Sequence, residues 1–390
     1  MMKAGKGAVL SFIILILSAG LSRAQVPELI NDPQFRITAQ AAVDSIYNFN
    51  FEGSEQLLRP WKEKYPDHPL WLLIEGMALW WEVLSDLNDT SHDEQFFYLM
   101  KRADYESSKL LRKNSSHADG LIIKAVSNGY VARHYANREE WLSSLNQARR
   151  ALSAHEHLSR LQPGLADLKL AEGLKLYYSA YLPEAYPIVK TVSWFLPDGD
   201  KAKGMALLAE ASNEAIFARA EAAYFLGNIN YNYEKNYEVA ARYFEELYRT
   251  YPRNNYYVRL LVKSYYRMKR YDEALAIIND SMERWEKHDL PYQKVVSEEL
   301  LTWKGRILTR KFQFEKAMDS YREAFALGEM LPRTDYRPFH AISGYYLGRL
   351  YCENNNYPEA EKYFKSVTSS RAGAGYKSLA EQTLTRCRGN

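Results

Sequence analysis

The residues best able to do chemistry in this 390-residue chain are a few histidines, two cysteines and one glycine-rich segment. The densest cluster is His155-Glu156-His157, but its histidines are two residues apart, whereas a zinc-binding helix spaces them four apart. We interpret this cluster as a solvated helix face. The remaining histidines have no partner at a spacing that predicts catalysis: His68, His92, His117, His134, His288 and His340.

The glycine-rich segment at residues 373–378 is similar to a phosphate-binding loop. Tyr376 interrupts its Gly-Lys-Ser step, and no strand is predicted before it, so we interpret it as a linker to a capping helix at residues 378–387. We therefore predict no catalytic residue, no metal ligand and no cofactor, and a chain that is not an enzyme. An enzyme with a site in the N-terminal half is the alternative.

Cys352 and Cys387 are the two cysteines, and both lie near the C-terminus. They could form a disulfide in an oxidising compartment. Alternatively, Cys352 could be a small buried residue of a predicted helix.

The first 24 residues have the features of a secretory signal peptide. Lys3 and Lys6 precede an apolar run at residues 8–21, and Ser22-Arg23-Ala24 places small residues at positions −3 and −1 of a cut before Gln25. A retained membrane anchor is the alternative, but the run is short for the roughly 20 residues that span a bilayer. We therefore expect an exported protein, periplasmic or secreted, with no integral membrane span after cleavage.

The formal charge of +3 comes from this leader, because Lys3, Lys6 and Arg23 are the only charged residues in it. The rest of the chain contains as many acidic as basic residues. A nucleic-acid partner normally requires a basic excess, so we expect none.

Small and large apolar residues recur at set intervals in the second half of the chain. Ala274 follows Ala240 at one interval, and Ala317 and Ala360 then follow at a longer interval that is the same for both. The small set is Gly227, Gly305, Gly348, Ala240, Ala274, Ala317 and Ala360, and the large set is Tyr265, Tyr351, Phe244, Ile278, Tyr321 and Phe364. Two helices pack closely where small residues let the backbones approach and large residues fill the space beside them.

This pattern resembles the tetratricopeptide repeat, because the spacing of Ala240 and Ala274 equals its period of about 34 residues. The resemblance implies an all-α fold, a right-handed α-solenoid of antiparallel helix pairs with helices of about 14 residues. It covers residues 220–370 and, in a more diverged form, residues 40–190. We therefore divide the chain into a diverged half at residues 25–215, an array of about four repeats at residues 216–372 and a C-terminal cap at residues 373–390. We count seven or eight repeats. The longer intervals predict extended loops or helices near residues 287–295 and 330–339.

One segment outside the repeats, residues 196–211, is a polar turn that opens a helix, with Asp198 or Asp200 as its N-cap. It resembles a Gly-Asp-Arg-x-x-Gly segment of the tetratricopeptide-39 and inclusion-body-clearance family, although Lys201 replaces the arginine of that family. The resemblance implies a subfamily with a long central helical hairpin, and no activity follows from it.

The tetratricopeptide resemblance also implies which residues line the concave surface, because the first helix of each pair faces it. Acidic residues are nearly absent from these positions, with Glu221, Glu299 and Glu353 at the margins. The predicted groove consists of Tyr224, Asn228, Tyr231, Asn232, Tyr256, Arg259, Lys263, Tyr266, Arg267, Arg306, Arg310, Tyr345 and Arg349, with Thr302 beside them. Tyrosine and arginine are typical of protein interfaces, and arginine grips carboxylates through two hydrogen bonds. We expect the groove to bind a protein or peptide, with a preference for acidic or C-terminal carboxylate segments.

The alternative function is a receptor for a glycan or small molecule, which would stack on exposed aromatic rings. The candidate platforms are Trp71, Trp80, Trp81, Trp141 and the tyrosines. Burial of the first three tryptophans between helices would remove the main support for this alternative.

Overall fold

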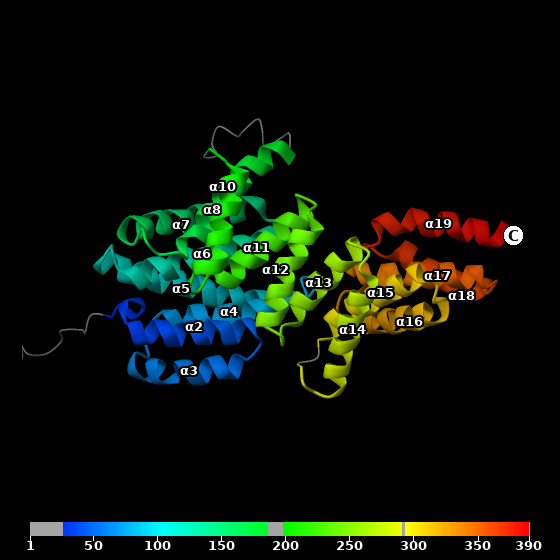
Figure 1. Ribbon diagram of the computed structural model, residues 1–390, viewed down its shortest axis with the longest axis horizontal. Coiled ribbons are helices and arrows are strands. Elements are labelled where there is room, and N and C mark those ends of the chain that lie inside the picture. Colours follow the sequence, from blue (N-terminus) through cyan, green and yellow to red (C-terminus); the bar gives the residue numbers. More distant parts are fainter. Residues whose placement is uncertain (1–25, 186–197, 291–292, 390) are drawn as a thin grey trace, which may run out of the picture.

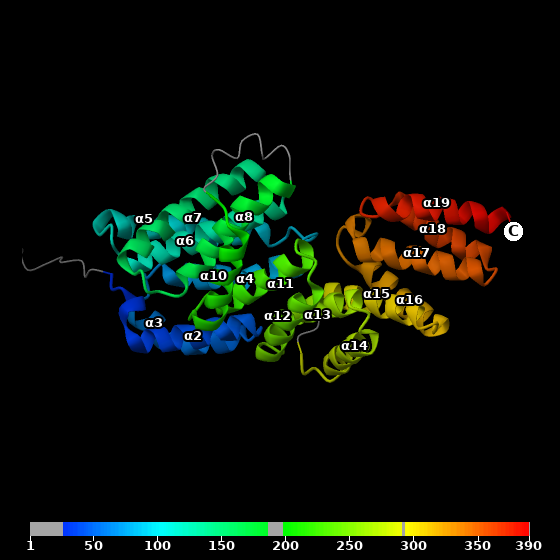
Figure 2. The ribbon, with the colours of Figure 1, turned by 45° about the horizontal axis from the view of Figure 1, so that its top comes forward.

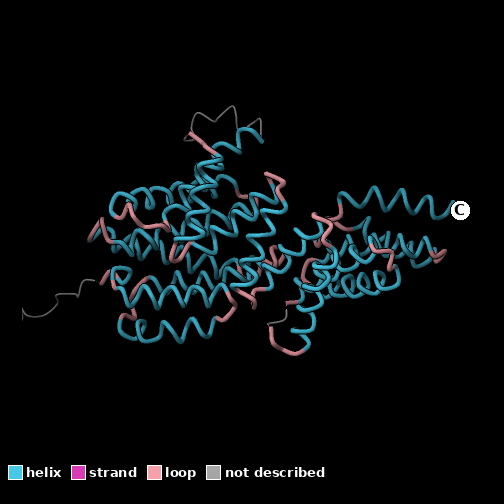
Figure 3. The backbone as a smooth tube through the Cα atoms, in the orientation of Figure 1, coloured by secondary structure: helices cyan, strands magenta, loops and turns pink. Residues whose placement is uncertain are grey.

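The computed structural model describes residues 26–185, 198–290 and 293–389. Within these ranges the chain forms seventeen α-helices and two short 3₁₀ helices, and no strand (Figures 1 and 3). The α-helices follow one another as antiparallel pairs, which run from α2 at one end of the elongated molecule to α19 at the other (Figures 1 and 2). The predicted fold class, an all-α solenoid of helix pairs, is confirmed.

Eight helix pairs and one closing helix make up the described chain. The pairs are α2 (Pro33–Tyr47) with α3 (Phe51–Lys64), α4 (Leu70–Ser85) with α5 (Asp93–Lys113), α6 (Ala118–Asn137) with α7 (Trp141–Leu161), α8 (Leu168–Ala185) with α10 (Lys201–Glu214), α11 (Arg219–Asn232) with α12 (Tyr237–Thr250), α13 (Asn255–Arg267) with α14 (Tyr271–Glu286), α15 (Lys294–Arg310) with α16 (Phe314–Met330), and α17 (Pro338–Glu353) with α18 (Tyr357–Ser369). Helix α19 (Ala374–Gly389) follows, and the 3₁₀ helices are η1 (Leu29–Asn31) and η3 (Thr334–Tyr336).

Three glycines explain how the pairs in the second half pack so closely. A Cβ atom on Gly227 would lie 2.3 Å from the ring of Phe244, and one on Gly305 would lie 2.6 Å from the ring of Tyr321. Gly348 has the same relation to Phe364, at 2.8 Å. Each glycine therefore makes room for a buried aromatic ring of its partner helix, as the spacing of small and large residues predicted.

The turns inside six of the eight pairs contain a residue with positive φ that is not glycine. These residues are Phe49, Glu139, Lys235, Lys269, Phe312 and Asn355, with φ between 55° and 62°. In each turn the next residue donates its backbone N–H to a carbonyl five or six residues earlier, as Gln313 does to Leu308 (2.9 Å). One turn geometry thus repeats along the array although its residue types differ.

The additional residues of the longer repeat intervals lie both in loops and in longer helices. Helices α15 and α16 each have 17 residues, whereas α11 and α12 have 14, which matches the expected length. The loop between α16 and α17 also contains η3.

Farther toward the N-terminus, Asp200 caps α10 by accepting the N–H of Lys203 (2.9 Å), so it fulfils the predicted N-cap role.

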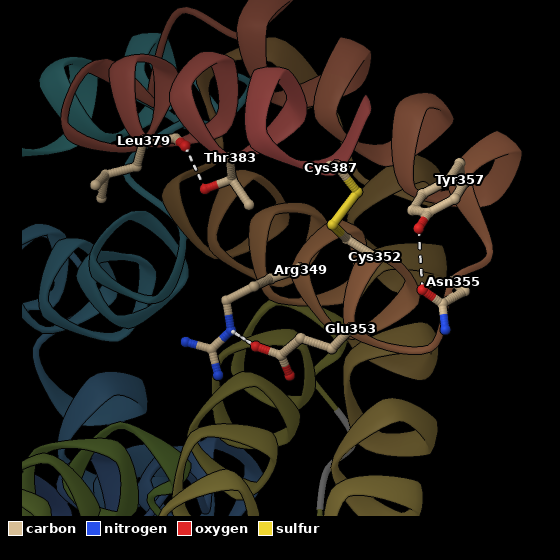
Figure 4. The surroundings of a disulfide bond; sticks show 8 residues. All are labelled: Arg349, Cys352, Glu353, Asn355, Tyr357, Leu379, Thr383 and Cys387. Atoms are coloured by element: carbon tan, nitrogen blue, oxygen red, sulfur yellow. Dashed lines mark hydrogen bonds and ion pairs between the residues drawn. A yellow bond between two sulfur atoms is a disulfide. The ribbon is translucent and has the colours of Figure 1, made fainter. Parts of the chain in front are cut away.

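Helix α19 covers the C-terminal end of the array. Cys387 on α19 forms a disulfide with Cys352 on α17, and their Cα atoms are 5.8 Å apart (Figure 4). Of the two roles left open for Cys352, the disulfide is the one observed. The glycine-rich segment is not a loop, because α19 begins at Ala374 and includes Gly375 to Ser378.

A strap at residues 26–31 is held against the N-terminal pairs by buried polar side chains. Asp119 accepts the N–H groups of Leu29 (2.6 Å) and Ile30 (3.0 Å). The Nε2 atoms of His68 and His117 lie 3.2 and 3.1 Å from the carbonyl oxygens of Pro27 and Val26. Each of these three side chains is only 3% exposed. These two histidines thus fix the start of the described chain.

Candidate functional site: the basic tyrosine face

Part of the predicted groove is covered by the chain itself. Arg259 donates to the backbone carbonyls of Ser85 (3.0 Å) and Leu84 (3.3 Å) at the end of α4. Its guanidinium lies 4.2 Å from the centre of the Tyr256 ring. The hydroxyls of Tyr256 and Tyr224 are 3.1 Å apart. Because the corner between α4 and α5 occupies this end, these three groove residues are engaged inside the molecule.

The same corner is held by a buried ionic cluster. Arg337, 1% exposed, pairs with Asp86 and lies 3.7 Å from the carboxylate of Glu298. Burial raises the pKa of Glu298 to about 7, although Arg337 acts in the opposite direction. The cluster therefore joins α4, α15 and the start of α17 through desolvated charges, which are costly when left unpaired.

The acidic residues that we expected at the margins of the groove are engaged in ion pairs. Glu299 is buried and pairs with Arg259 at 3.6 Å. Glu221 accepts from Arg133 at 3.3 Å. The third, Glu353, forms an ion pair with Arg349 at 3.2 Å (Figure 4). The pair of Glu221 with Arg133 depends on the docking of the N-terminal half, which the repeat spacing does not encode.

The open part of the predicted groove contains four cationic side chains in two pairs, each spaced four residues apart on one helix. We define the basic tyrosine face as these cations and the rings beside them. The cations are Lys263 and Arg267 on α13 and Arg306 and Arg310 on α15, and the rings are Tyr231, Tyr237, Tyr266 and Trp303. Because α13 and α15 pack against each other, the two pairs are neighbours.

Each cation of this face rests on an aromatic ring or a phenol oxygen. Lys263 Nζ lies 4.8 Å from the centre of the Tyr231 ring, and Arg267 Nε donates to the Tyr231 hydroxyl at 3.4 Å. Arg306 lies 4.8 Å from the Tyr266 ring and 4.5 Å from the Trp303 ring. The rings hold the cations in place by cation–π attraction.

No carboxylate in the described part of the chain forms an ion pair with any of these four cations. The pKa of Arg267 is raised, first by its hydrogen bond to Tyr231, and the pKa of Arg310 is raised, first by a hydrogen bond to Tyr266. Phenols thus take the place that carboxylates have elsewhere. The face keeps its full positive charge and remains open to an anionic ligand.

The remaining predicted residues lie at the borders of this face. Asn228 donates to the Tyr224 carbonyl at 2.9 Å, and Asn232 is exposed one turn later. Tyr345 is buried against Tyr376 of α19, with ring centres 5.2 Å apart. The structure therefore brings six predicted residues together in the open face: Tyr231, Lys263, Tyr266, Arg267, Arg306 and Arg310.

Two aromatic residues of the face were missed from the sequence. Trp303 lies beneath Arg306, three residues earlier on the same helix, and Tyr237 lies 5.8 Å from Arg267. Trp303 could have been found from its spacing to Arg306, because residues three apart share a helix face. Thr302 is fully buried and bonds to Ser343 (2.8 Å), so it does not line the face.

The tryptophans proposed as stacking platforms are mostly inside the molecule. Trp71, Trp80 and Trp81 are 8%, 1% and 4% exposed, and only Trp141 of the four is accessible. This burial removes the main support for a glycan or small-molecule receptor.

In the histidine cluster, His155 Nε2 is 2.9 Å from the Leu168 carbonyl oxygen.

Neither a metal centre nor a membrane span is visible in the described residues. Among them, no three His, Cys, Asp or Glu side chains are grouped so as to hold a metal ion. Likewise, none of the described helices has the length and apolar character needed to cross a bilayer. The predicted leader, residues 1–24, lies outside the described residues.

Comparison with known proteins found no matching family model and no matching curated protein. Among solved structures, the chain is similar to a tetratricopeptide repeat protein from Parabacteroides merdae, with 14% identity, over 80% of this chain and 98% of that one, at a TM-score of 0.33. It is also similar to yeast Tom70, with 16% identity over 93% and 90% of the two chains, at a TM-score of 0.29. Such distant similarity carries no functional argument, and the fold assignment rests on the helix pairs themselves.

Proposed function

We propose that this chain is a protein-binding helical-repeat scaffold whose basic tyrosine face binds an acidic segment of a partner polypeptide. The observation that supports this proposal is the set of four cations, Lys263, Arg267, Arg306 and Arg310, that are supported by rings and paired with no carboxylate among the described residues. A partner carboxylate would supply the missing counter-charge. An exposed C-terminal carboxylate belongs to the same ligand class.

The geometry favours binding because the cations are already positioned. A long side chain normally loses rotamer freedom when it binds, and this loss lowers affinity. Arg306 lies against both Tyr266 and Trp303, whose rings also contact each other, so less freedom remains to be lost. A guanidinium can then form two parallel hydrogen bonds to one carboxylate.

We also propose that the scaffold is exported, to the periplasm or the exterior, with residues 1–24 as its signal peptide. The disulfide between Cys352 and Cys387 agrees with an oxidising compartment. Amino-terminal sequencing of the protein recovered from outside the cytoplasm tests this part, and a start at Met1 would contradict it.

The binding proposal is tested by fluorescence polarisation with a labelled decapeptide of alternating Asp and Gly. The neutral control peptide carries Asn in place of Asp. We expect binding of the acidic peptide alone, weakened about tenfold by Arg306→Ala with Arg310→Ala, because two charge-assisted contacts are lost.

The matched control variant is Arg270→Ala with Arg322→Ala. These arginines also lie on tyrosine rings, Tyr265 and Tyr351, but each is paired with a carboxylate, Arg270 with Glu273 and Arg322 with Asp319. The control should bind the acidic peptide like the parent protein. Equal loss in the two double variants, or equal affinity for the Asp and Asn peptides, would refute the proposal.

A further inference from the structure

A second unusual surface lies near one end of the molecule, where α5 and α7 flank α6 (Figures 1 and 2). The first turns of α7 expose three adjacent large apolar side chains: Trp141 is 66%, Leu142 86% and Leu145 48% exposed. On α5, Tyr98 and Tyr105 are 63% and 52% exposed. Single exposed apolar residues are ordinary, but a contiguous group of them indicates an interaction surface.

The exposed ends of α5 and α7 lie side by side. Both helices pack antiparallel to α6, so both begin at the same end of the three-helix layer. Arg138, in the turn before α7, makes two 2.7 Å contacts with Asp93, the first residue of α5. The starts of α5 and α7 are therefore neighbours, and we call the exposed side chains of these two helices the α5–α7 face.

This face has a small excess of cations. Helix α5 and residues 138–150 contain eight Lys and Arg residues against six Asp and Glu residues. Lys101 and Arg149 have no carboxylate partner among the described residues, and Lys101 lies 4.6 Å from the Phe97 ring. Exposed aromatic and aliphatic groups beside unpaired cations are the combination that anchors proteins at anionic lipid headgroups.

A polar cavity of about 250 Å³ lies between the two helices. Its walls include Lys101 from α5 and Arg150 from α7, and its floor includes Ser127 and Asn128 of α6, which are 0% and 2% exposed. The one carboxylate among its described lining residues, Asp104, is shared by Lys124 and Arg150. The cavity thus keeps a positive charge, as a site for a phosphate group requires.

From these observations we infer that the α5–α7 face docks on an anionic phospholipid surface. Trp141, Leu142 and Leu145 enter the interfacial region, and Lys101, Arg149 and Arg150 contact headgroup phosphates. The basic tyrosine face, on α13 and α15, lies farther along the molecule, so a membrane-bound chain keeps it free for a partner (Figure 1).

Sedimentation with vesicles tests this inference. Since the apolar run at residues 8–21 would bind lipid by itself, all variants are compared in the chain that begins at Gln25. We expect binding to vesicles that contain about one third phosphatidylglycerol, little binding to pure phosphatidylcholine, and a blue shift of Trp141 emission on binding.

Two variants and one control separate docking from other effects. The triple change Trp141→Ser, Leu142→Ser and Leu145→Ser, and separately Lys101→Gln with Arg149→Gln, should each weaken vesicle binding about tenfold or more. Phe312→Ser with Lys316→Gln changes an exposed aromatic residue and an exposed cation at the other end of the array, and should leave binding unchanged.

The inference is overturned by an absence of vesicle binding, by equal binding to neutral and anionic vesicles, or by an equal loss in the control variant. Circular dichroism of each variant shows that the helices remain intact. The acidic-peptide assay is independent of this experiment, because it uses no lipid and its variants lie at the other end of the array.

Discussion

Cationic side chains have different surroundings in two regions of the molecule. At the junction between the N-terminal half and the later repeats, each of three arginines meets a carboxylate: Arg133 pairs with Glu221, Arg259 with Glu299, and Arg337 with Asp86. On the basic tyrosine face, Arg306 and its neighbours meet only rings and hydroxyls among the described residues. The difference separates cations that hold the structure together from cations that remain available to a ligand.

The free-energy cost of removing an arginine also differs between the two regions. A buried ion pair repays the desolvation of its charges only while both partners are present. A partly solvated arginine on a tyrosine ring gains a modest attraction and loses little when it is removed. Mutations at the junction should therefore act on stability, and mutations on the face should act on binding.

The largest effect is expected for Arg337→Ala, which leaves Asp86 and Glu298 in the junction without their cation. We expect a loss of about 3–5 kcal/mol in the free energy of unfolding, measured by urea denaturation. Arg306→Ala, on the open face, should lose less than about 1 kcal/mol. Similar losses in the two variants would break the distinction between the regions.

The next largest effect is the change of folding stability with pH that the junction causes. Burial raises the pKa of Glu298 from 4.5 to about 7, against the pull of Arg337, with Asp86, Glu299 and His340 beside it. The folded protein therefore retains a proton that the unfolded chain loses, so this group lowers stability as the pH rises from 4.5 to 7.

Glu298→Gln removes this titration. The unfolding free energy of the variant relative to the parent should rise by about 2–3 kcal/mol between about pH 4.5 and pH 8, as followed by urea denaturation. The corresponding change in an exposed ion pair of the last repeat, Glu353→Gln, should show no such rise. A constant difference across this pH range for Glu298→Gln would contradict the buried state of the carboxyl group.

The packing of helices can be compared between the N-terminal half and the later repeats. Gly227→Ala would place a Cβ atom 2.3 Å from the buried Phe244 ring and should cost about 1–3 kcal/mol. Gly129→Ala, on α6 in the N-terminal half, meets nothing within 4 Å and should add up to about 1 kcal/mol. Thermal denaturation should show a loss of stability for Gly227→Ala and a gain for Gly129→Ala. A loss in both would mean that helix α6 is more tightly covered than the structure shows.

The smallest effect concerns the turns, which should behave alike in both halves. Glu139→Gly and Phe312→Gly replace residues with φ of 62° and 59°, a region in which glycine has no steric penalty. Each change should raise the unfolding free energy by about 0.5–1 kcal/mol, measurable by urea denaturation. A loss of stability for Phe312→Gly would show that its exposed ring contributes to the fold.

The local spacing of residues was enough to predict the helix pairs of the second half. Gly305 and Tyr321, for example, lie on the two helices of one hairpin, so their contact follows from the repeat itself. The same reasoning placed Lys263, Arg267, Arg306 and Arg310 on one surface. Their role in binding stays a prediction, because no partner is present in the structure.

The covered part of the groove could not be predicted in this way. Arg259 contacts Ser85, which is 174 residues away in the sequence, and Arg337 contacts Asp86, which is 251 residues away. Such contacts depend on how the whole array curves, and the period of the repeat gives no information about them. The strap at residues 26–31 was missed for a similar reason, since His117 looks isolated in sequence and finds its partner 91 residues away.

The strap and the disulfide have a joint consequence for how the array loses its structure. A linear array of repeats normally frays from its ends, where the last repeat has one neighbour instead of two. Here one end is tied by His68, His117 and Asp119, and the other by the bond between Cys352 and Cys387. Because both terminal segments are held to the helices beside them, fraying of single helices from the ends is suppressed and we expect a more cooperative transition. Reduction of the disulfide should let α19 detach from α17 first.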